Sequence, residues 1–182
     1  MVSIVNAGFP FFLLMLLTRN IPMEEFGELV IYETILVILI PVIHFSLAGM
    51  VVEYFKLEKL QFQKYVSNII ILIAPVFLIV QVLFFIFGAG LAEVLDLDIN
   101  WLLLIPIYVL LNSFIQIPVS IAQCEGNIIK YGIFLLGPNF SILIITYILL
   151  VNFDFGYEAK LYAIGVSNIC FASLSLLFLA KK

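Results

Sequence analysis

The chain is a series of long apolar runs separated by short polar links. A helix needs about 20 apolar residues to cross the hydrocarbon core of a bilayer, which is about 30 Å thick. A run such as "IIILIAPVFLIVQVLFFIF" does not alternate between polar and apolar residues, as a membrane strand of about ten residues would. The pattern therefore predicts six transmembrane helices, at about 2–18, 26–52, 65–87, 101–122, 131–152 and 159–180. Gly88, Ala89 and Gly90 are expected to form the link after the third helix.

Composition decides between a membrane protein and a soluble one. The chain is 65% hydrophobic and 11% charged, with a mean hydropathy of +1.26. Soluble globular domains are about 45–50% apolar and about 25% charged. A soluble domain of 182 residues would not have enough polar surface to cover this much apolar material. We therefore expect an all-α integral membrane protein, with residues 1–182 forming a single six-helix bundle in the lipid bilayer.

The basic residues are distributed unequally between the two sides of the predicted bundle. Only Arg19 and Lys160 lie on one side, and cytoplasmic links carry an excess of Lys and Arg. The opposite side is therefore expected to face the cytoplasm, with both termini cytoplasmic and the chain in the inner membrane. The start, "MVSIVNAGFP", lacks the charged region of a cleavable signal peptide, so the first helix is expected to be retained. The residues on the predicted cytoplasmic side are Lys56, Lys59, Lys64, Lys130, Lys181 and Lys182.

Two ionisable residues are predicted to lie within the second helix. An ionised carboxylate such as Glu33 costs about 2–3 kcal/mol near the centre of a membrane helix, so it is expected to face protein or a wet cavity. His44 follows eleven residues later, within roughly 20° of the same helix face, with Pro41 between them. The pair either lines a polar or proton-linked cavity or makes two separate helix contacts. The sequence leaves both interpretations open.

The fourth predicted helix carries a regular row of polar residues at intervals of four, four, four and three. This spacing places them on one helix face, which is expected to point away from lipid. Interhelical hydrogen bonds, worth about 0.6 kcal/mol each, explain such a row, and so does a hydrophilic path for a sugar headgroup. The pattern does not separate these alternatives. The row consists of Tyr108, Asn112, Gln116, Ser120 and Gln123.

Sequence motifs for enzyme chemistry are not found. The single histidine has no serine, cysteine or carboxylate pair within a turn, and no HExxH motif or glycine-rich phosphate loop occurs. Cys124 and Cys170 lie in or beside apolar segments, without Cys or His at metal-binding spacing. We therefore expect neither an enzyme nor a cofactor or metal site. The net charge of −4 also argues against nucleic acid as a partner.

Prolines occur in each of the first five predicted helices. Proline removes a backbone donor and clashes with the preceding turn, so kinked helices are expected. Kinks suit a protein that bends, although static membrane proteins also contain them. The prolines are Pro10, Pro41, Pro75, Pro106, Pro118 and Pro138.

The first predicted hairpin resembles a known family. The stretch "NAGFPFFLLMLLTRNIPMEEFGELVIYETIL" is similar to the first hairpin of the Wzx-type polysaccharide and O-antigen flippases, members of the multidrug/oligosaccharidyl-lipid/polysaccharide superfamily. Leu17-Thr18-Arg19 and the following Pro22, Glu24, Glu25, Phe26 and Gly27 carry the likeness. Later stretches, "SLAGMVVEYF", "QCEGNIIKYGIFLLGPNFSILIITYILL" and "FGYEAKLYAIGVSNICFASLSLLFL", extend it over nearly the whole chain. Ile21 differs, because the family usually has a capping Ser there, and the helix cap is expected to be about 1 kcal/mol weaker.

The resemblance implies a function and a substrate. Such flippases have two six-helix lobes around a central cavity, and this chain resembles the N-terminal lobe. The implied activity is translocation of an undecaprenyl-pyrophosphate-linked oligosaccharide in polysaccharide or O-antigen biosynthesis. Glu33, His44 and the polar row would line half of the path, and Arg19 is a candidate to meet the pyrophosphate or is an ordinary helix-end arginine. A proton or sodium ion acting at Glu33 is a further hypothesis.

Three alternatives remain open from the sequence. Alternating access generally requires two units that rock about a shared site, so one lobe is expected to need a second lobe or polypeptide. A multidrug exporter of the same superfamily would have a more aromatic, cation-binding cavity. A non-transporting scaffold that binds polysaccharide-assembly proteins is the third possibility.

Overall fold

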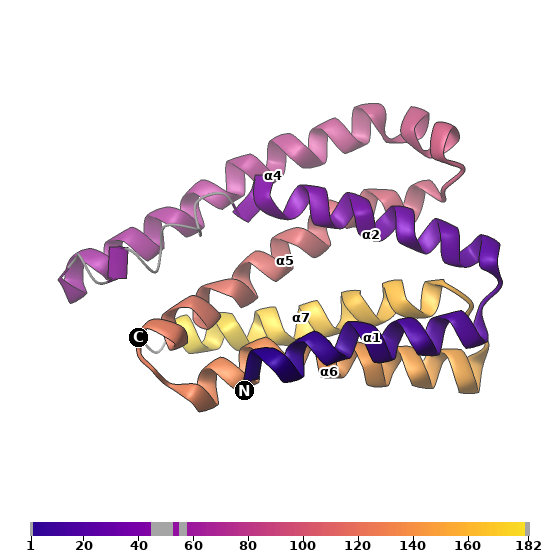
Figure 1. The fold of residues 1–182 in the computed structure, drawn as a ribbon. Helices are drawn as coiled ribbons and strands as arrows, with labels where there is room; N and C mark the ends of the chain where they lie inside the picture. Colours follow the sequence, from indigo (N-terminus) through magenta and orange to yellow (C-terminus); the bar gives the residue numbers. More distant parts are fainter. Residues whose placement is uncertain (1, 45–52, 55–57, 181–182) are drawn as a thin grey trace.

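The computed structural model describes residues 2–44, 53–54 and 58–180. The helices in this part of the chain follow one another as an up-and-down bundle (Figure 1). α1 begins and α7 ends at the same end of the bundle. Their bounds are α1 Val2–Asn20, α2 Met23–His44, α4 Lys59–Leu95, α5 Ile99–Cys124, α6 Ile128–Phe153 and α7 Glu158–Ala180.

The predicted all-helical membrane architecture is confirmed. All six predicted helices are present, and five of them are long and apolar enough to cross a membrane within the described residues. α1, the shortest at 19 residues, is not among those five. The second predicted helix extended to residue 52, and its last eight positions lie outside the described residues. The other differences between prediction and structure concern the residues at which the helices begin and end.

The third predicted helix is longer in the structure than apolarity alone indicated. α4 has 37 residues and would span about 55 Å, well beyond the hydrocarbon thickness. The prediction that Gly88, Ala89 and Gly90 form a link is wrong, because all three lie inside α4. Gly88 is buried against α5, and an added Cβ would lie 3.4 Å from Leu103. The glycine thus allows close helix packing rather than ending the helix.

Side-chain caps and left-handed residues set several helix ends. Asp98 caps α5 by accepting a hydrogen bond from the backbone N–H of Asn100, and Asn127 caps α6 in the same way from Lys130. Asp96 and Asp154 follow α4 and α6 with φ of 54° and 56°, the left-handed conformation that often terminates a helix. Proline does not end helices here: all six prolines named above lie within continuous helices.

The burial of Ile21 explains why an apolar residue stands at this position. The side chain is only 8% exposed and belongs to the hydrophobic core, together with Phe26 in the first turn of α2. A hydrophobic residue before the cap commonly packs against one in the first turn and fixes the angle at which the chain enters the helix. The Pro22 carbonyl accepts the first helical hydrogen bond, from Phe26 at 3.0 Å. Pro22 therefore directly precedes α2.

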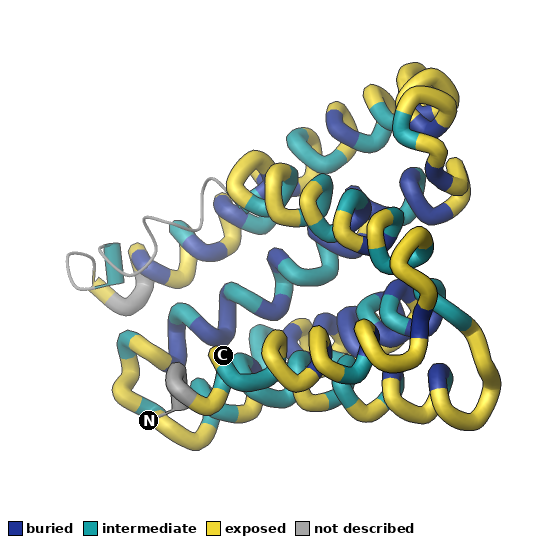
Figure 2. Tube along the Cα trace, turned by 45° about the vertical axis from the view of Figure 1, so that its right-hand side comes forward, coloured by how far each residue is buried: buried dark blue, intermediate teal, exposed yellow. Residues whose placement is uncertain are grey.

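α5 lies at the centre of the bundle. It packs against α2, α4, α6 and α7, whereas α1 packs mainly on α6 (Figure 1). More than half of its apolar stretch is buried, a larger share than in the other candidate membrane helices. The outer surfaces of α4 and α6 are exposed and apolar, as a lipid-facing surface requires (Figure 2).

The first hairpin is splayed. α1 and α2 are joined by a short turn, but α1 lies along α6 while α2 lies with α5 and α4 (Figures 1 and 2). The two helices make few contacts with each other and diverge away from the turn. The hairpin therefore contributes one helix to each of two parts of the bundle.

Candidate functional site

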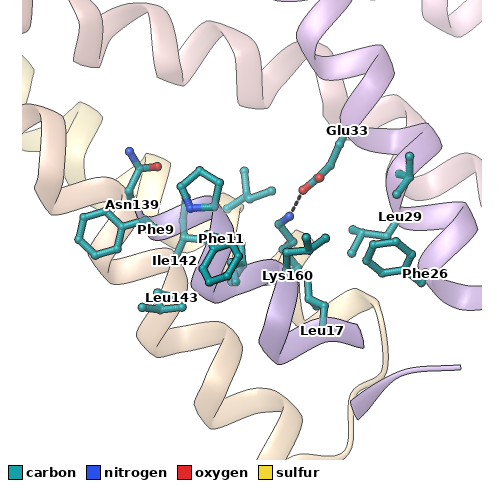
Figure 3. Close-up of a pocket in the computed structure, with 15 residues that line it drawn as sticks. Phe9, Phe11, Leu17, Phe26, Leu29, Glu33, Asn139, Ile142, Leu143 and Lys160 are labelled. Atoms are coloured by element: carbon teal, nitrogen blue, oxygen red, sulfur yellow. Dashed lines mark ion pairs between the residues drawn. The ribbon is translucent and has the colours of Figure 1, made fainter. Parts of the chain in front are cut away.

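A cavity of about 540 Å³ lies between the splayed helices. Its walls come from α1, α2, α6 and α7 (Figure 3). The volume falls within the range of about 300–1,000 Å³ that is typical of small-molecule sites. Most of the lining is apolar, and its polar members are Glu33, Asn139 and Lys160.

Glu33 and Lys160 form an ion pair inside this cavity (Figure 3). The side chains point toward one another from α2 and α7. The Lys160 side chain is 11% exposed and the Glu33 side chain 36% exposed. The lysine is therefore the more deeply buried partner, and the carboxylate retains more contact with the open space.

The helix geometry explains how these two residues meet. α2 and α7 begin at the same end of the bundle, with Glu33 ten residues into α2 and Lys160 two residues into α7. At about 1.5 Å per residue, Glu33 is roughly 12 Å deeper along its helix. Side chains on a helix lean toward its N-terminus, which brings the Glu33 carboxylate back toward the helix starts. The long lysine chain extends past apolar surface in the opposite direction to meet it.

An amide pair joins α1 to α6 beside the same cavity. Asn139 Nδ2 donates to Asn6 Oδ1 at 2.8 Å, and Asn139 also lines the cavity. An amide hydrogen bond between membrane helices stabilises the contact modestly, by about 0.6 kcal/mol. This pair holds α1 on the α6 side and leaves α2 free to lie with α5.

The end of the bundle where α2 and α7 begin is held by polar contacts. Tyr157 N–H donates to Glu25 Oε2 at 3.1 Å, and the Tyr32 hydroxyl donates to the Asp98 carbonyl at 3.0 Å. The Tyr32 and Tyr157 rings stack with centroids 6.2 Å apart. Burial raises the pKa of the Tyr157 phenol, and neighbouring Tyr32 and acidic side chains raise it further, so it stays protonated.

Trp101 adds a contact at this end. Its Nε1 donates to Glu158 Oε1 at 3.2 Å, and its ring packs edge-on against Tyr162 with centroids 4.7 Å apart. The contact joins the start of α5 to the start of α7. An amphipathic indole is suited to the membrane–water boundary, where the sequence places it. The helix starts are thus tied together by residues from three elements.

The predicted site residues do not all come together. Glu33 lines the cavity, whereas His44 lies at the end of α2, where its imidazole hydrogen-bonds to the backbone of Val109 on α5. His44 Nε2 is buried and has no hydrogen-bond partner in the described part of the chain. Arg19 is exposed at the end of α1. The shared face predicted for Glu33 and His44 is interrupted because α2 passes from the cavity to α5.

The polar row on α5 is divided between two environments. Tyr108 is buried against α7, where an added Cβ at Gly165 would lie 3.0 Å from its hydroxyl, and Asn168 donates to the Tyr108 carbonyl at 3.2 Å. Asn112, Gln116 and Ser120 are half-buried and form no side-chain hydrogen bond to any described residue. None of the row, including the exposed Gln123, is among the residues that line the cavity.

Lys160 is the site residue that sequence reasoning missed. In the charge pattern of the sequence, Lys160 is only one of two basic residues on the side opposite the lysine-rich links. The available signal was the cost of Glu33 within a membrane helix, which a basic partner would reduce. The sequence does not identify that partner, because Arg19 and Lys160 are both near the same end. The contact itself depends on how α2 and α7 are rotated.

Comparison with known proteins supports the membrane assignment. The chain is 26% identical over 174 residues to a Haemophilus influenzae protein named "Uncharacterized membrane protein". The aligned region covers 95% of this chain and 41% of the relative, so the chain spans less than half of the relative's length. The likeness to a membrane protein and the five helices that are long and apolar enough to cross a membrane together identify the class of protein. The chain is a multi-pass membrane protein. No protein-family model and no solved structure matches it.

Proposed function

We propose that this multi-pass chain forms one lobe of an inner-membrane flippase, which moves a lipid-linked oligosaccharide across the bilayer during polysaccharide or O-antigen biosynthesis. The observation that carries the proposal is the ion pair between Glu33 and Lys160 inside a largely apolar cavity. Charged groups within membrane segments commonly mark substrate or ion pathways. The hairpin that resembles the flippases supplies α1 and α2, two of the four walls.

The parts of this lobe suit the parts of an amphiphilic substrate. The apolar walls accommodate a lipid chain, and the charged pair offers partners to a pyrophosphate. Asn112, Gln116 and Ser120 on α5 have hydrogen-bonding capacity that no described residue uses, which suits sugar hydroxyls. Glu33 is the candidate site for a coupling proton or sodium ion once Lys160 is paired with a bound anion instead. A second six-helix unit, from another polypeptide or another copy, would supply the opposite half of the path.

The proposal includes an orientation in the membrane. Lys160 is paired within the cavity, which leaves Arg19 as the remaining basic residue on the side opposite the lysine-rich links. The excess of unpaired basic residues on the lysine-rich side, which orients the chain, is therefore larger than the sequence count of six against two indicates. We expect a fluorescent protein fused after Lys182 to fold in the cytoplasm, and alkaline phosphatase inserted between Asp96 and Asp98 to be active in the periplasm. An active phosphatase at Lys182 would contradict the orientation.

The transport proposal is tested in vesicles. Purified chain is reconstituted, and the fraction of a fluorescent undecaprenyl-pyrophosphate-linked disaccharide protected from dithionite is followed. With a second copy of the chain supplying the other lobe, we expect translocation above that of protein-free vesicles. The rate should decrease by about tenfold when Asn112→Leu, Gln116→Leu and Ser120→Ala are combined, because the path loses its polar groups. Ser67→Ala with Asn68→Leu on the exposed surface of α4 is the matched control and should translocate normally. Equal rates in the two variants would contradict a role for the α5 row.

A multidrug exporter is the second candidate, because part of the cavity wall is aromatic. Phe9, Phe11 and Phe26 line the cavity, and aromatic faces attract lipophilic cations, but such a cation would have to compete with Lys160 for the Glu33 carboxylate. Uptake of tetraphenylphosphonium by the same vesicles, without translocation of the disaccharide lipid, would replace the flippase proposal with this one. Transport of neither compound would indicate either that the second lobe is a different polypeptide or that the chain is a scaffold in polysaccharide assembly.

A further inference from the structure

A ligand could replace one partner of the cavity ion pair more easily than the other. Lys160 is 11% exposed, whereas Glu33 is 36% exposed. Glu25 and Glu158 lie at the same end of the bundle, but they accept hydrogen bonds from Tyr157 and Trp101 and form no ion pair with Lys160 in the described part of the chain. Glu33 is therefore the carboxylate that neutralises Lys160.

The difference in burial between Lys160 and Glu33 determines which charge a bound ligand can carry. A cationic ligand at Glu33 would displace Lys160 and leave a deeply buried ammonium without a partner, which is strongly unfavourable. An anionic ligand at Lys160 would displace Glu33 instead. The carboxylate, which is 36% exposed, can then be hydrated at smaller cost. The pair is thus built to exchange its anion rather than its cation.

The rest of the cavity determines what accompanies that anion. Phe9, Phe11, Leu14 and Leu17 of α1 form one wall, and Leu143 of α6 extends it. A small hydrated anion would gain nothing from such walls, whereas a long apolar chain would gain by covering them. The cavity is bounded by helices of a membrane protein, so the bilayer is the direct source of such a ligand.

We propose that the cavity between α1, α2, α6 and α7 binds a membrane lipid with a phosphate headgroup, with Lys160 as the phosphate ligand and Glu33 as the resident anion that the phosphate replaces. The lipid chain lies along the aromatic and aliphatic wall of α1. The inference deepens the proposed function and rests on it for the view that the cavity receives a lipid-borne substrate.

The test is equilibrium binding to the purified full chain in detergent, measured by native mass spectrometry. The probes are undecaprenyl phosphate and dioleoyl phosphatidic acid, with dioleoylglycerol as the lipid that lacks phosphate. We expect the phosphate lipids to bind about tenfold more tightly than dioleoylglycerol, since a charge-assisted hydrogen bond distinguishes them. Excess inorganic phosphate should compete weakly, because it lacks the chain.

Variants of the chain identify the residue that binds the phosphate. Lys160→Gln should reduce binding of both phosphate lipids to the level of dioleoylglycerol, Lys160→Arg should retain it, and Glu33→Gln should strengthen it. Lys64→Gln, at an exposed lysine of α4, removes the same charge elsewhere and should change nothing. If Lys160→Gln does not fold, the double variant Glu33→Gln with Lys160→Gln replaces it, because that variant leaves no charge unpaired.

The outcomes separate this inference from the transport proposal. Lys160-dependent binding of either phosphate lipid supports the inference even if the vesicles translocate no disaccharide lipid, in which case the flippase proposal alone is overturned. Phosphate lipids that bind no better than dioleoylglycerol, or Lys160→Gln protein that binds them as Lys64→Gln protein does, would overturn the inference. Stronger competition by inorganic phosphate than by either lipid would also overturn it.

Discussion

Replacing Glu33 with alanine should lower the free energy of unfolding by about 2 kcal/mol or more, because it leaves the Lys160 ammonium buried without its carboxylate. Replacing Lys160 with alanine should cost about half as much. The Glu33 side chain is 36% exposed, so it can remain hydrated when its partner is lost. The order of these two losses follows from the unequal burial of the pair. Reversible unfolding of the purified chain in mixed micelles measures all of these variants.

The double variant makes the prediction specific. Glu33→Ala combined with Lys160→Ala should be more stable than Glu33→Ala alone, since the second substitution removes the unpaired charge. Glu93→Ala, at an exposed position of α4, is the matched control and should leave stability unchanged. If the losses of the two single variants simply add in the double variant, the ion pair does not couple α2 to α7.

Replacing Gly156 with alanine should lower the free energy of unfolding by about 3 kcal/mol. Gly156 has a φ of +60°, where a side chain costs about 1–2 kcal/mol. An added Cβ would also lie 2.6 Å from Glu25 Oε2. The Glu25 side chain can move aside, but it then loses the hydrogen bond from Tyr157 N–H, a bond to a charged group worth about 1.5–3 kcal/mol. The link between α6 and α7 would thus lose its connection to α2.

Gly126 provides the matched control for this substitution. It has a φ of +65°, and an added Cβ would meet nothing within 4 Å. Gly126→Ala should therefore show the backbone cost alone, about 1 kcal/mol. In a Glu25→Ala background, Gly156→Ala should fall to the same cost, because the hydrogen bond is already absent. Similar losses for both glycine variants in the unmodified chain would refute the role of the Glu25 contact, as measured by unfolding in the same micelles.

Both predictions concern contacts that hold α2 in place. Glu25 ties the first turn of α2 to the residue before α7, and Glu33 reaches α7 again two to three turns deeper. Tyr32 joins the same helix to the start of α5. If α2 moves during a transport cycle, these three contacts must break or exchange partners. The cavity charge pair is therefore placed where binding of a ligand would loosen one of them.

The sequence correctly indicated which parts of the chain are helical and that they belong in a membrane. This information is local: about 20 consecutive apolar residues must pair their own backbone groups once they are in lipid. The boundaries were less well predicted. α4 extends through Gly88 and Gly90 because its ends are polar but still compatible with helix, and apolarity does not report that. The membrane cost of Glu33 likewise predicted a protein-facing position without naming its partner.

Only the tertiary structure showed that Glu33 meets Lys160, that Glu25 meets the chain before α7, and that His44 instead contacts α5. The periodicity of a helix states which of its residues share a face, but not which neighbouring helix that face meets or at what depth. Those relations depend on the tilt and rotation of every helix, which are set by packing around α5 and by residues far apart in the chain. The sequence by itself thus determined the helices and their membrane environment, whereas packing decided the composition of the cavity.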